Sequence, residues 1–470
     1  MNIVNVIRNE TASLPPEKIA VCAETGDLSY TALFRAVDAV ADILKKEGLA
    51  PCSRVGLAFP DSMDYIILSL AVLSLDAVLV PVAVSAAREV VEEILEKTAA
   101  DFLISSAELL SVEAMWMKQK TLPGQNGFYL VRCMPTASLP DEFNAMEPAF
   151  IRFSSGTTGT SKGVLLTHPA IVERTDAADQ ALKITSADTV LWVLSMSFHF
   201  VVSILLFLRR GATICLCSEM FPFSFLSAVK RGDGTFIYAT PFHYRTLIEA
   251  KALDPKALSG IRMAISTAMK LPPETDVAFR DKFGLGLQEA YGIIEVGLPF
   301  VNAAGSKPEG AVGRALPGFE LEIRDADKKG GGEVFLRGPG MYAAYLYPWR
   351  RRETNEWFAT GDTGRLDQDG FLTLLGRTKN LINFAGMKVF PYEVEAVLDR
   401  FPGVHASLVY AKPHPRYGQL PCAKVEANGV TAEELQRYCY EHLESYKVPK
   451  KIEIVERLER TESGKIKRAV

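Results

Sequence analysis

The stretch Phe153-Ser-Ser-Gly-Thr-Thr-Gly-Thr-Ser-Lys-Gly163 runs directly into the apolar segment Val164-Leu-Leu166. Its eleven positions hold three glycines, six hydroxyl residues and one lysine. Glycines let the backbone approach a ligand closely, so that successive N–H groups line an anion site, to which hydroxyls and a lysine add donors. The spacing is not the usual P-loop pattern, because no glycine directly precedes Lys162. A flexible linker is the alternative, but it explains neither the lysine nor the apolar flanks, so the stretch predicts a phosphate-binding loop.

Strand and helix patterns alternate on both sides of this loop. Apolar residues recur at helical spacing after Thr31, which we expect to cap a helix that Gly48 ends. Further strands and helices are predicted in turn at 54–59, 62–75 and 77–82, and after the loop at 168–182 and 190–198. This β-α-β rhythm favours a parallel sheet covered by helices.

Composition excludes several classes of protein. The 470 residues suggest two or three domains, and 52 basic against 56 acidic side chains give a net charge of −4, which favours neither nucleic acid nor an anionic membrane. Seven scattered cysteines without a CxxC pair indicate reduced thiols and a cytoplasmic location. The apolar run 65–84 contains Asp76 and Pro81, so we expect no membrane span and, given the start of the chain, no signal peptide.

Further motifs follow the loop along the chain. They are Gln288-Glu-Ala-Tyr-Gly-Ile-Ile-Glu295, Trp357-Phe-Ala-Thr-Gly-Asp362, Gly376-Arg-Thr-Lys-Asn380, Asn383-Phe-Ala-Gly-Met-Lys-Val-Phe-Pro391 and Arg460-Thr-Glu-Ser-Gly-Lys465-Ile-Lys-Arg468. Together with the loop, and in this order, they closely resemble the adenylate-forming superfamily, which includes acyl-CoA and aryl-CoA synthetases, peptide-synthetase adenylation domains and beetle luciferases. The resemblance covers nearly the whole chain.

The resemblance implies an α/β fold in two parts. A large N-terminal AMP-binding domain, residues 1–376, would hold two helix-covered, doubly wound sheets and a small β-barrel subdomain at about 300–376. A hinge at 377–380, with Lys379 in it, would lead to a small mobile α+β lid at 381–470. Domain motion about such a hinge is a known switching device.

The resemblance also implies a set of residues for ATP. Tyr291 would stack on adenine, Asp362 would hold the ribose hydroxyls, and Lys162 and Lys465 would stabilise charge during catalysis. Mg²⁺ would be bound by Thr158 and Glu295, since a hard cation prefers oxygen ligands. The full ATP-binding set is Ser154, Ser155, Gly156, Thr157, Thr158, Lys162, Glu289, Ala290, Tyr291, Gly292, Asp362, Arg377 and Lys465.

A second implied set concerns the acid and the thiol. The acyl pocket would be lined by His199, which is also a catalytic candidate, with Ser203, Thr267 and Ala268. The last two stand where the family has glycines, and Lys270 stands where it has proline, so we expect a narrowed pocket. The thiol arm would pass Gly386, Met387 and Lys388.

The implied activity is that of an acid–thiol ligase. A carboxylate would displace pyrophosphate from ATP·Mg²⁺ to give an acyl-adenylate, and coenzyme A would then take the acyl group. No carboxylate lies in 198–205 to hold an α-ammonium, so we expect an aliphatic or aryl acid rather than an amino acid. Three alternatives stay open: the phosphopantetheine of a separate acyl carrier protein as acceptor, release or luciferase-like use of the adenylate, and a nucleotide-binding module impaired by Ile294 in place of the family's hydroxyl.

Overall fold

The computed structural model spans the chain and describes residues 1–106, 127–154, 162–217, 221–231, 234–302, 308, 310–460 and 466–468, with the backbone alone at 117–121 and 154. Several predicted site residues lie outside the described residues: Ser155, Gly156, Thr157, Thr158 and Lys465, together with the side chain of Ser154.

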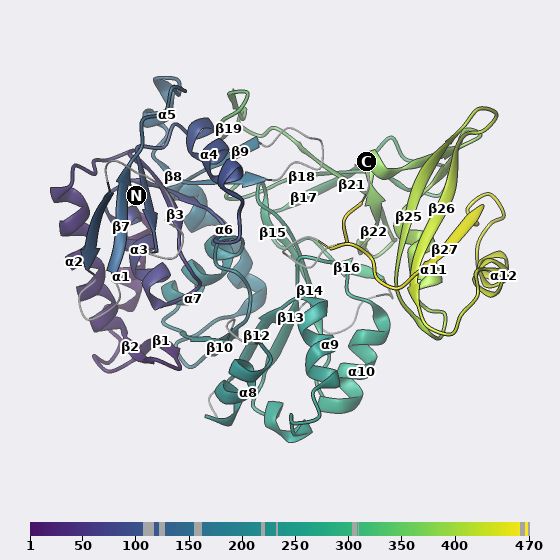
Figure 1. The fold of residues 1–470 in the computed structure, drawn as a ribbon, viewed down its shortest axis with the longest axis horizontal. Helices are drawn as coiled ribbons and strands as arrows, with labels where there is room; N and C mark the ends of the chain where they lie inside the picture. The colour runs from purple at the N-terminus through teal and green to yellow at the C-terminus, as the bar shows by residue number, and fades with distance from the viewer. Residues whose placement is uncertain are drawn as a thin grey trace.

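Two large sheets form the body of the molecule on the left and below in Figure 1. The first has nine strands in the order β20-β19-β9-β8-β4-β3-β5-β7-β6, and its centre, from β8 to β5, is parallel. Its strands are β3 (Arg54–Ala58), β4 (Val78–Pro81), β5 (Phe102–Ser105), β6 (Met117–Thr121), β7 (Gly127–Arg132), β8 (Pro148–Ser154), β9 (Lys162–Thr167), β19 (Ala344–Tyr345) and β20 (Arg350–Arg351).

The second sheet has eight strands in the order β15-β14-β13-β12-β10-β11-β1-β2. It is parallel from β14 to β1, and the outer strands β15 and β2 run antiparallel to their neighbours. Its strands are β1 (Ile19–Ala23), β2 (Gly26–Ser29), β10 (Thr189–Trp192), β11 (Thr213–Leu216), β12 (Phe236–Ala239), β13 (Met263–Ser266), β14 (Gln288–Ile293) and β15 (Gly297–Val301).

Helices accompany both sheets, and their first residues are set by capping side chains. The Ser29 hydroxyl accepts the Ala32 N–H at 3.2 Å, so the second helix begins at Tyr30 rather than after the predicted cap Thr31. The helices are α1 (Ile3–Thr11), α2 (Tyr30–Lys46), α3 (Met63–Ser74), α4 (Arg88–Lys97), α5 (Glu142–Ala145), α6 (His168–Leu182), α7 (Leu205–Arg209), α8 (Phe223–Lys230), α9 (Pro241–Glu249) and α10 (Pro273–Phe283), with 3₁₀ turns at Pro255–Leu258 and Thr378–Asn380.

Two smaller sheets complete the fold toward the right of Figure 1. One is antiparallel: β16 (Ala311–Gly313), β17 (Glu320–Arg324), β18 (Gly332–Arg337), β21 (Phe358–Leu366) and β22 (Leu372–Arg377). The other forms, with two helices, the C-terminal domain predicted to be the lid: β23 (Ile382–Phe384), β24 (Met387–Val389), β25 (Val404–His414), β26 (Gly418–Ala427), β27 (Lys451–Val455), α11 (Pro391–Leu398) and α12 (Ala432–His442). The predicted fold class, helix-covered sheets with a small β-rich subdomain and a separate α+β C-terminal domain, is confirmed, whereas the mobility of that domain, named the lid, remains a prediction.

One predicted element differs from the structure. The strand expected at 190–198 ends at Trp192, and a tight turn follows before a π-helix at Phe200–Ile204. The Ser195 carbonyl accepts the N–H groups of Phe198 and His199 at 3.2 and 3.1 Å, which turns the chain out of the sheet. Within the described residues, no helix is both long and apolar enough to cross a membrane.

Candidate active site

Asp362 lies at the centre of a buried polar cluster. It sits on β21 directly opposite Arg377 of β22, and the Arg377 Nε lies 2.8 Å from its Oδ1. The Tyr291 hydroxyl donates to the other carboxylate oxygen, Oδ2. Asp362 is 4 % exposed, whereas Tyr291 and Arg377 are partly exposed. The structure therefore joins three residues that stand far apart in the sequence.

Tyr291 comes from β14, at the edge of the parallel part of the second sheet. Antiparallel pairing places it opposite Phe300 of β15, with ring centroids 5.8 Å apart. Burial, and then the charge of Asp362, raises the pKa of Tyr291, so the phenol keeps its proton and remains a donor. Ala290 is buried beside it, while Gly292 is exposed and packs so closely that a Cβ there would lie 2.8 Å from the Gly297 carbonyl oxygen.

A second cluster surrounds Glu295. The Tyr345 hydroxyl donates to the Glu295 carboxylate at 3.0 Å, and the Lys162 ammonium lies 4.8 Å from the centre of the same tyrosine ring. Tyr345 reaches this place because β19 pairs with β9, opposite Val164. Burial, and then the charge of Glu295, raises the pKa of Tyr345. The end of the Gly-rich stretch and the predicted metal ligand are thus joined through one phenol.

The segment that carries His199 is tied to the strand before the Gly-rich stretch. Arg152 of β8 donates to the Phe198 carbonyl, and its guanidinium lies 5.1 Å from the centre of the Phe198 ring. Ser203, on the π-helix, is 1 % exposed and donates to the His199 carbonyl. His199 itself is half-buried. Ser203 therefore supports the backbone of this segment.

The turn after β13 holds the other predicted pocket residues. Ala268 adopts the left-handed conformation, with φ of 69°, although it is not glycine. The buried Thr267 hydroxyl donates to the Ala290 carbonyl at 3.4 Å, and Glu289 accepts the Leu271 N–H at 3.1 Å. These contacts fasten the turn to β14 beside Tyr291. Lys270 is half-buried there, and burial lowers its pKa. The negative charges of Glu289 and of Glu395 and Asp399 in the C-terminal domain raise it, but by less.

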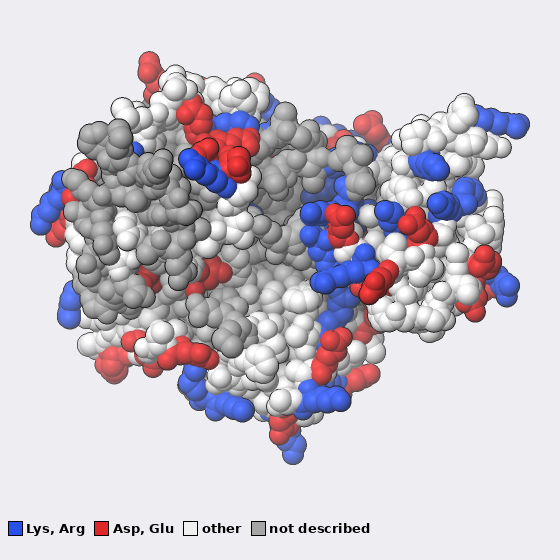
Figure 2. Space-filling view, viewed as in Figure 1, with Lys and Arg blue, Asp and Glu red and all other residues white. Residues whose placement is uncertain are grey.

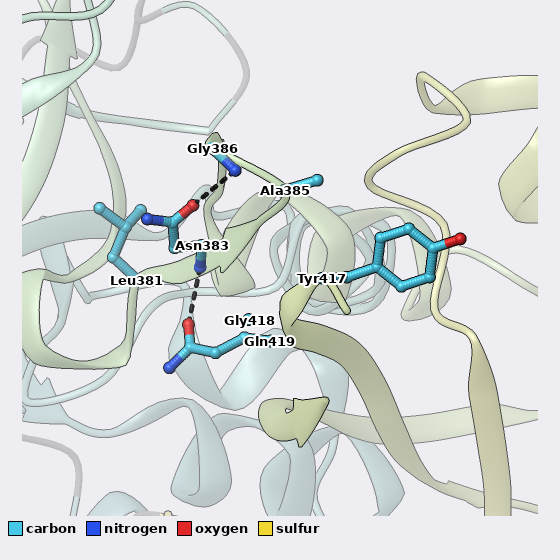
Figure 3. A pocket seen from close by; sticks show the side chains of 7 residues that line it. All are labelled: Leu381, Asn383, Ala385, Gly386, Tyr417, Gly418 and Gln419. Carbon is cyan, nitrogen blue, oxygen red and sulfur yellow. Dashed lines mark hydrogen bonds between the residues drawn. The ribbon is translucent and has the colours of Figure 1, made fainter. Parts of the chain in front are cut away.

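The predicted thiol segment lies on the lid and is not joined to these clusters. Ala385 and Gly386 form the two-residue turn between β23 and β24, with φ of 51° and 85°. Gly386, Met387 and Lys388 are exposed, and Lys388 donates to the Asp325 carbonyl at 3.2 Å. The turn borders an open hollow of about 650 Å³, where Asn383 accepts the Gly386 N–H and its own N–H donates to Gln419 (Figure 3).

Charge gathers where the lid meets the body. Figure 2 shows lysine and arginine side chains, with some acidic ones among them, along the boundary between the two. The predicted hinge residue Lys379 is exposed in the 3₁₀ turn Thr378–Asn380, directly after Arg377. A boundary lined with cations attracts anionic ligands such as phosphates.

Two residues of the site, Arg152 and Tyr345, were not predicted from the sequence. Arg152 stands one position before the quoted Gly-rich stretch, and a charged residue within an otherwise apolar strand was the available signal. Tyr345 carried no local signal, because only the pairing of β19 with β9 brings it to Lys162 and Glu295.

Known proteins similar to this chain share its organisation. The profile of the AMP-binding enzyme family matches residues 9–346, and the profile of the AMP-binding enzyme C-terminal domain matches residues 393–465. A probable CoA ligase of Humulus lupulus is 27 % identical over 100 % of this chain and 96 % of its own length. A sulfoacetate–CoA ligase of Cupriavidus necator is 33 % identical over 68 % of this chain and 66 % of its own length.

Among solved structures, an amide bond synthetase of Marinactinospora thermotolerans superposes with a TM-score of 0.85 at 25 % identity, covering 99 % of this chain and 98 % of that protein. An anthranilate CoA ligase bound to anthranoyl-AMP superposes with a TM-score of 0.84 at 22 % identity, covering 99 % of this chain and 95 % of the ligase. The second likeness concerns the fold alone.

Proposed function

Because this chain belongs to the family of AMP-binding enzymes, we propose that it is an ATP-dependent acid–thiol ligase that forms an acyl-adenylate and passes the acyl group to coenzyme A. The observation that carries the proposal is the joined cluster of Tyr291, Asp362 and Arg377. A buried carboxylate already aligned by two donors has the oxygens that a ribose diol requires.

The residues present fit ATP and a magnesium ion. Asp362 would accept the ribose hydroxyls, Arg377 would contact ribose or phosphate, and Tyr291 would stack on adenine beside Glu289, Ala290 and Gly292. Lys162 would contact the phosphates. Glu295 offers the carboxylate oxygen that Mg²⁺ prefers, and the ion would screen the triphosphate charge. Two further roles remain predictions. One is phosphate binding by Ser154, Ser155, Gly156, Thr157 and Thr158, and the other is metal binding by Thr158.

The reaction has two balanced halves. A carboxylate oxygen attacks the α-phosphorus, and the bond to pyrophosphate breaks. The thiolate sulfur of coenzyme A then attacks the acyl carbon, and AMP leaves. Carboxylate and triphosphate repel each other, so we assign Lys162 and Lys465 to stabilising the negative charge, with His199 beside the reacting carboxylate.

The acid is a non-amino-acid carboxylate. His199, Ser203, Thr267 and Ala268 would bound its pocket, and the absence of a carboxylate from 198–205 leaves no partner there for an α-ammonium. The sulfoacetate–CoA ligase supports an organic acid as substrate, and both this ligase and the probable CoA ligase of Humulus lupulus support coenzyme A as acceptor.

The lid would deliver the thiol. We infer one domain over residues 1–376, a hinge at 377–380 that contains Lys379, and a lid over 381–470 whose Gly386, Met387 and Lys388 border the thiol path. The hollow beside Gly386 supports this assignment, because it leaves room for a flexible arm, and two of its lining residues, Gly386 and Gly418, have no side chain.

The test is ATP–pyrophosphate exchange across a panel of aliphatic, aryl and sulfonated carboxylic acids. The proposal predicts exchange with at least one acid and thioester formation, followed by mass spectrometry, when coenzyme A is added. Exchange without thioester on coenzyme A, but with thioester on an acyl carrier protein, would move the acceptor to the carrier. If no acid supports exchange although ATP binds, the catalytically impaired nucleotide-binding module would be favoured.

A further inference from the structure

Three cysteines meet at β1 and at the end of β11, two strands that carry none of the residues assigned above. Cys22 of β1 and Cys215 of β11 are direct partners in the parallel pairing of these strands. Cys217 follows two residues later, and its thiol donates to the Cys215 carbonyl at 3.3 Å. Cys215 and Cys217 are 3 % and 0 % exposed, whereas Cys22 is half-buried and opens the group toward solvent.

An arginine completes the group. Arg231, an exposed residue just after α8, donates from Nη2 to the Cys215 sulfur at 3.4 Å. Hydrogen bonds from Cys217 and Cys22, joined by the arginine, lower the pKa of Cys215. The pKa values of Cys22 and Cys217 are raised, first by their hydrogen bonds to Cys215. The arrangement therefore places the most easily ionised of the three sulfurs, Cys215, beside Arg231 and directly opposite the Cys22 thiol, as a nucleophile stands beside a resolving thiol.

We propose that Cys22 and Cys215 form a site of reversible oxidation by hydrogen peroxide, which ends in a disulfide between β1 and β11. The Cys215 sulfur attacks one peroxide oxygen, the O–O bond breaks, and the other oxygen leaves as water, giving a sulfenic acid. The Cys22 sulfur then attacks the Cys215 sulfur, and the hydroxyl leaves with the Cys22 proton as a second water. One peroxide is reduced to two waters as two thiols become one disulfide.

Strand geometry selects this pair. Neighbouring strands lie about 4.8 Å apart, and a disulfide spans Cα separations of roughly 4.4–6.8 Å. The Cα separation of Cys22 and Cys215 therefore falls within the disulfide range. Cys215 and Cys217 are two residues apart along one chain, which at about 3.3 Å per residue brings their Cα separation close to the upper limit of that range. Within the described part of the chain, no cluster of three His, Cys, Asp or Glu side chains has the arrangement of a metal site, so oxidation is favoured over metal binding.

Peptide mapping after treatment with hydrogen peroxide tests the proposal. Trypsin cleaves after Lys18 and Arg35, and after Arg210 and Lys230, so the expected product is a cross-linked pair of peptides, 19–35 with 211–230, two hydrogens lighter than the sum. Dithiothreitol should abolish it. Cys22→Ser should leave Cys215 as sulfenic acid, which a dimedone probe traps, and Cys52→Ser, which alters a half-buried cysteine outside the group, should react as the wild type does.

Arg231→Met keeps all three thiols and changes an exposed side chain, so it separates reactivity from folding. We expect oxidation of Cys215 to slow by roughly 3- to 10-fold, because the thiolate is the reactive form. The proposal is overturned if Cys52 or Cys133 oxidises faster than Cys215, if the product joins Cys215 to Cys217, or if folded wild type gives no cross-link. An unchanged rate in Arg231→Met would also overturn it.

Discussion

The proposed ribose site and the turn after β13 both adjoin β14, yet they resemble the family in different respects. The first has the family's side chains, and the second has the backbone conformation that the family's glycine would adopt. On the ribose side, Asp362, Tyr291 and Arg377 keep the family's side chains and bond to one another. In the turn 266–271 the side chains depart from the family, but Ala268 keeps the left-handed backbone that glycine would adopt. At the proposed ribose site, where we expect contact through side chains, the residues of the family motif are present. In the turn, where we expect contact through the backbone, the left-handed conformation is present although Ala268 carries a Cβ.

The largest effect is expected from removing the carboxylate of Asp362, which we propose binds the ribose hydroxyls. Asp362→Asn should lower kcat/KM for adenylation by roughly 10²–10⁴-fold, because breaking a buried charged pair costs about 3–5 kcal/mol and each 1.36 kcal/mol is tenfold. Steady-state exchange assays measure this. Asp369→Asn, on the exposed turn before β22, is the matched control and should stay near wild type. Unchanged ATP affinity and rate in folded Asp362→Asn would break the comparison.

The second-largest effect on catalysis is expected from Tyr345, whose phenol lies between Lys162 and Glu295. Tyr345→Phe removes one hydrogen bond to the Glu295 carboxylate, a loss of about 1.5–3 kcal/mol, or roughly 10- to 100-fold in kcat/KM if the bond persists in the transition state. The Mg²⁺ concentration for half-maximal activity should rise. The control is Tyr347→Phe, whose side chain is 56 % exposed. Equal effects from both variants would contradict a specific role for Tyr345.

The third prediction concerns Asp399 in the C-terminal domain, where the stability difference between Asp399→Asn and the wild type should depend on pH. Burial, and then Glu395 and Glu274, raises the pKa of Asp399 to about 7, and its Oδ1 has no hydrogen-bond partner. Because the folded state binds this proton more tightly than the unfolded state, the stabilisation is present below about pH 4 and is lost as the pH rises to about 7. Asp399→Asn should therefore be more stable than the wild type at pH 8, by up to about 4 kcal/mol, and similar at pH 4.

Urea unfolding at the two pH values measures this difference. Glu441→Gln neutralises an exposed acid of α12 and should show no such pH dependence. A stability gain for Asp399→Asn at pH 4 as large as at pH 8 would show that packing, rather than the carboxylate, is responsible.

The smallest effect concerns the turn itself. Ala268→Gly should raise the free energy of unfolding by about 0.5–1 kcal/mol, because the left-handed conformation penalises a Cβ by about 1–2 kcal/mol and glycine returns part of it as entropy. It should also admit bulkier acids in the exchange assay. Ala264→Gly, in the buried strand β13, should destabilise instead. Destabilisation by both substitutions would show that the methyl of Ala268 is needed for packing.

Local patterns predicted much of the fold and less of the site. The helix expected at 168–182 has those bounds, because Thr167 caps it and its apolar face repeats regularly. The strand expected at 190–198 was too long, since apolar residues continue into a turn held by the Ser195 carbonyl. Periodicity reports which side chains are buried, and it does not distinguish a strand from the buried turn that follows it.

For the site, motif order predicted Tyr291, Asp362 and Arg377, which the structure brings together. It did not predict Arg152 or Tyr345, whose contacts depend on pairing between distant strands and on the path of the Phe198 backbone. The roles assigned to Lys465 and to Ser155–Thr158 remain predictions.

Arg377 ends β22, and the 3₁₀ turn that leads to the lid begins at the next residue. The guanidinium paired with Asp362 therefore belongs to the residue that directly precedes the proposed hinge turn. A sugar bound to Asp362 in the proposed ribose site would act on this residue without any intermediate. We therefore expect nucleotide binding to bias the orientation of the C-terminal domain through the peptide bond between Arg377 and Thr378.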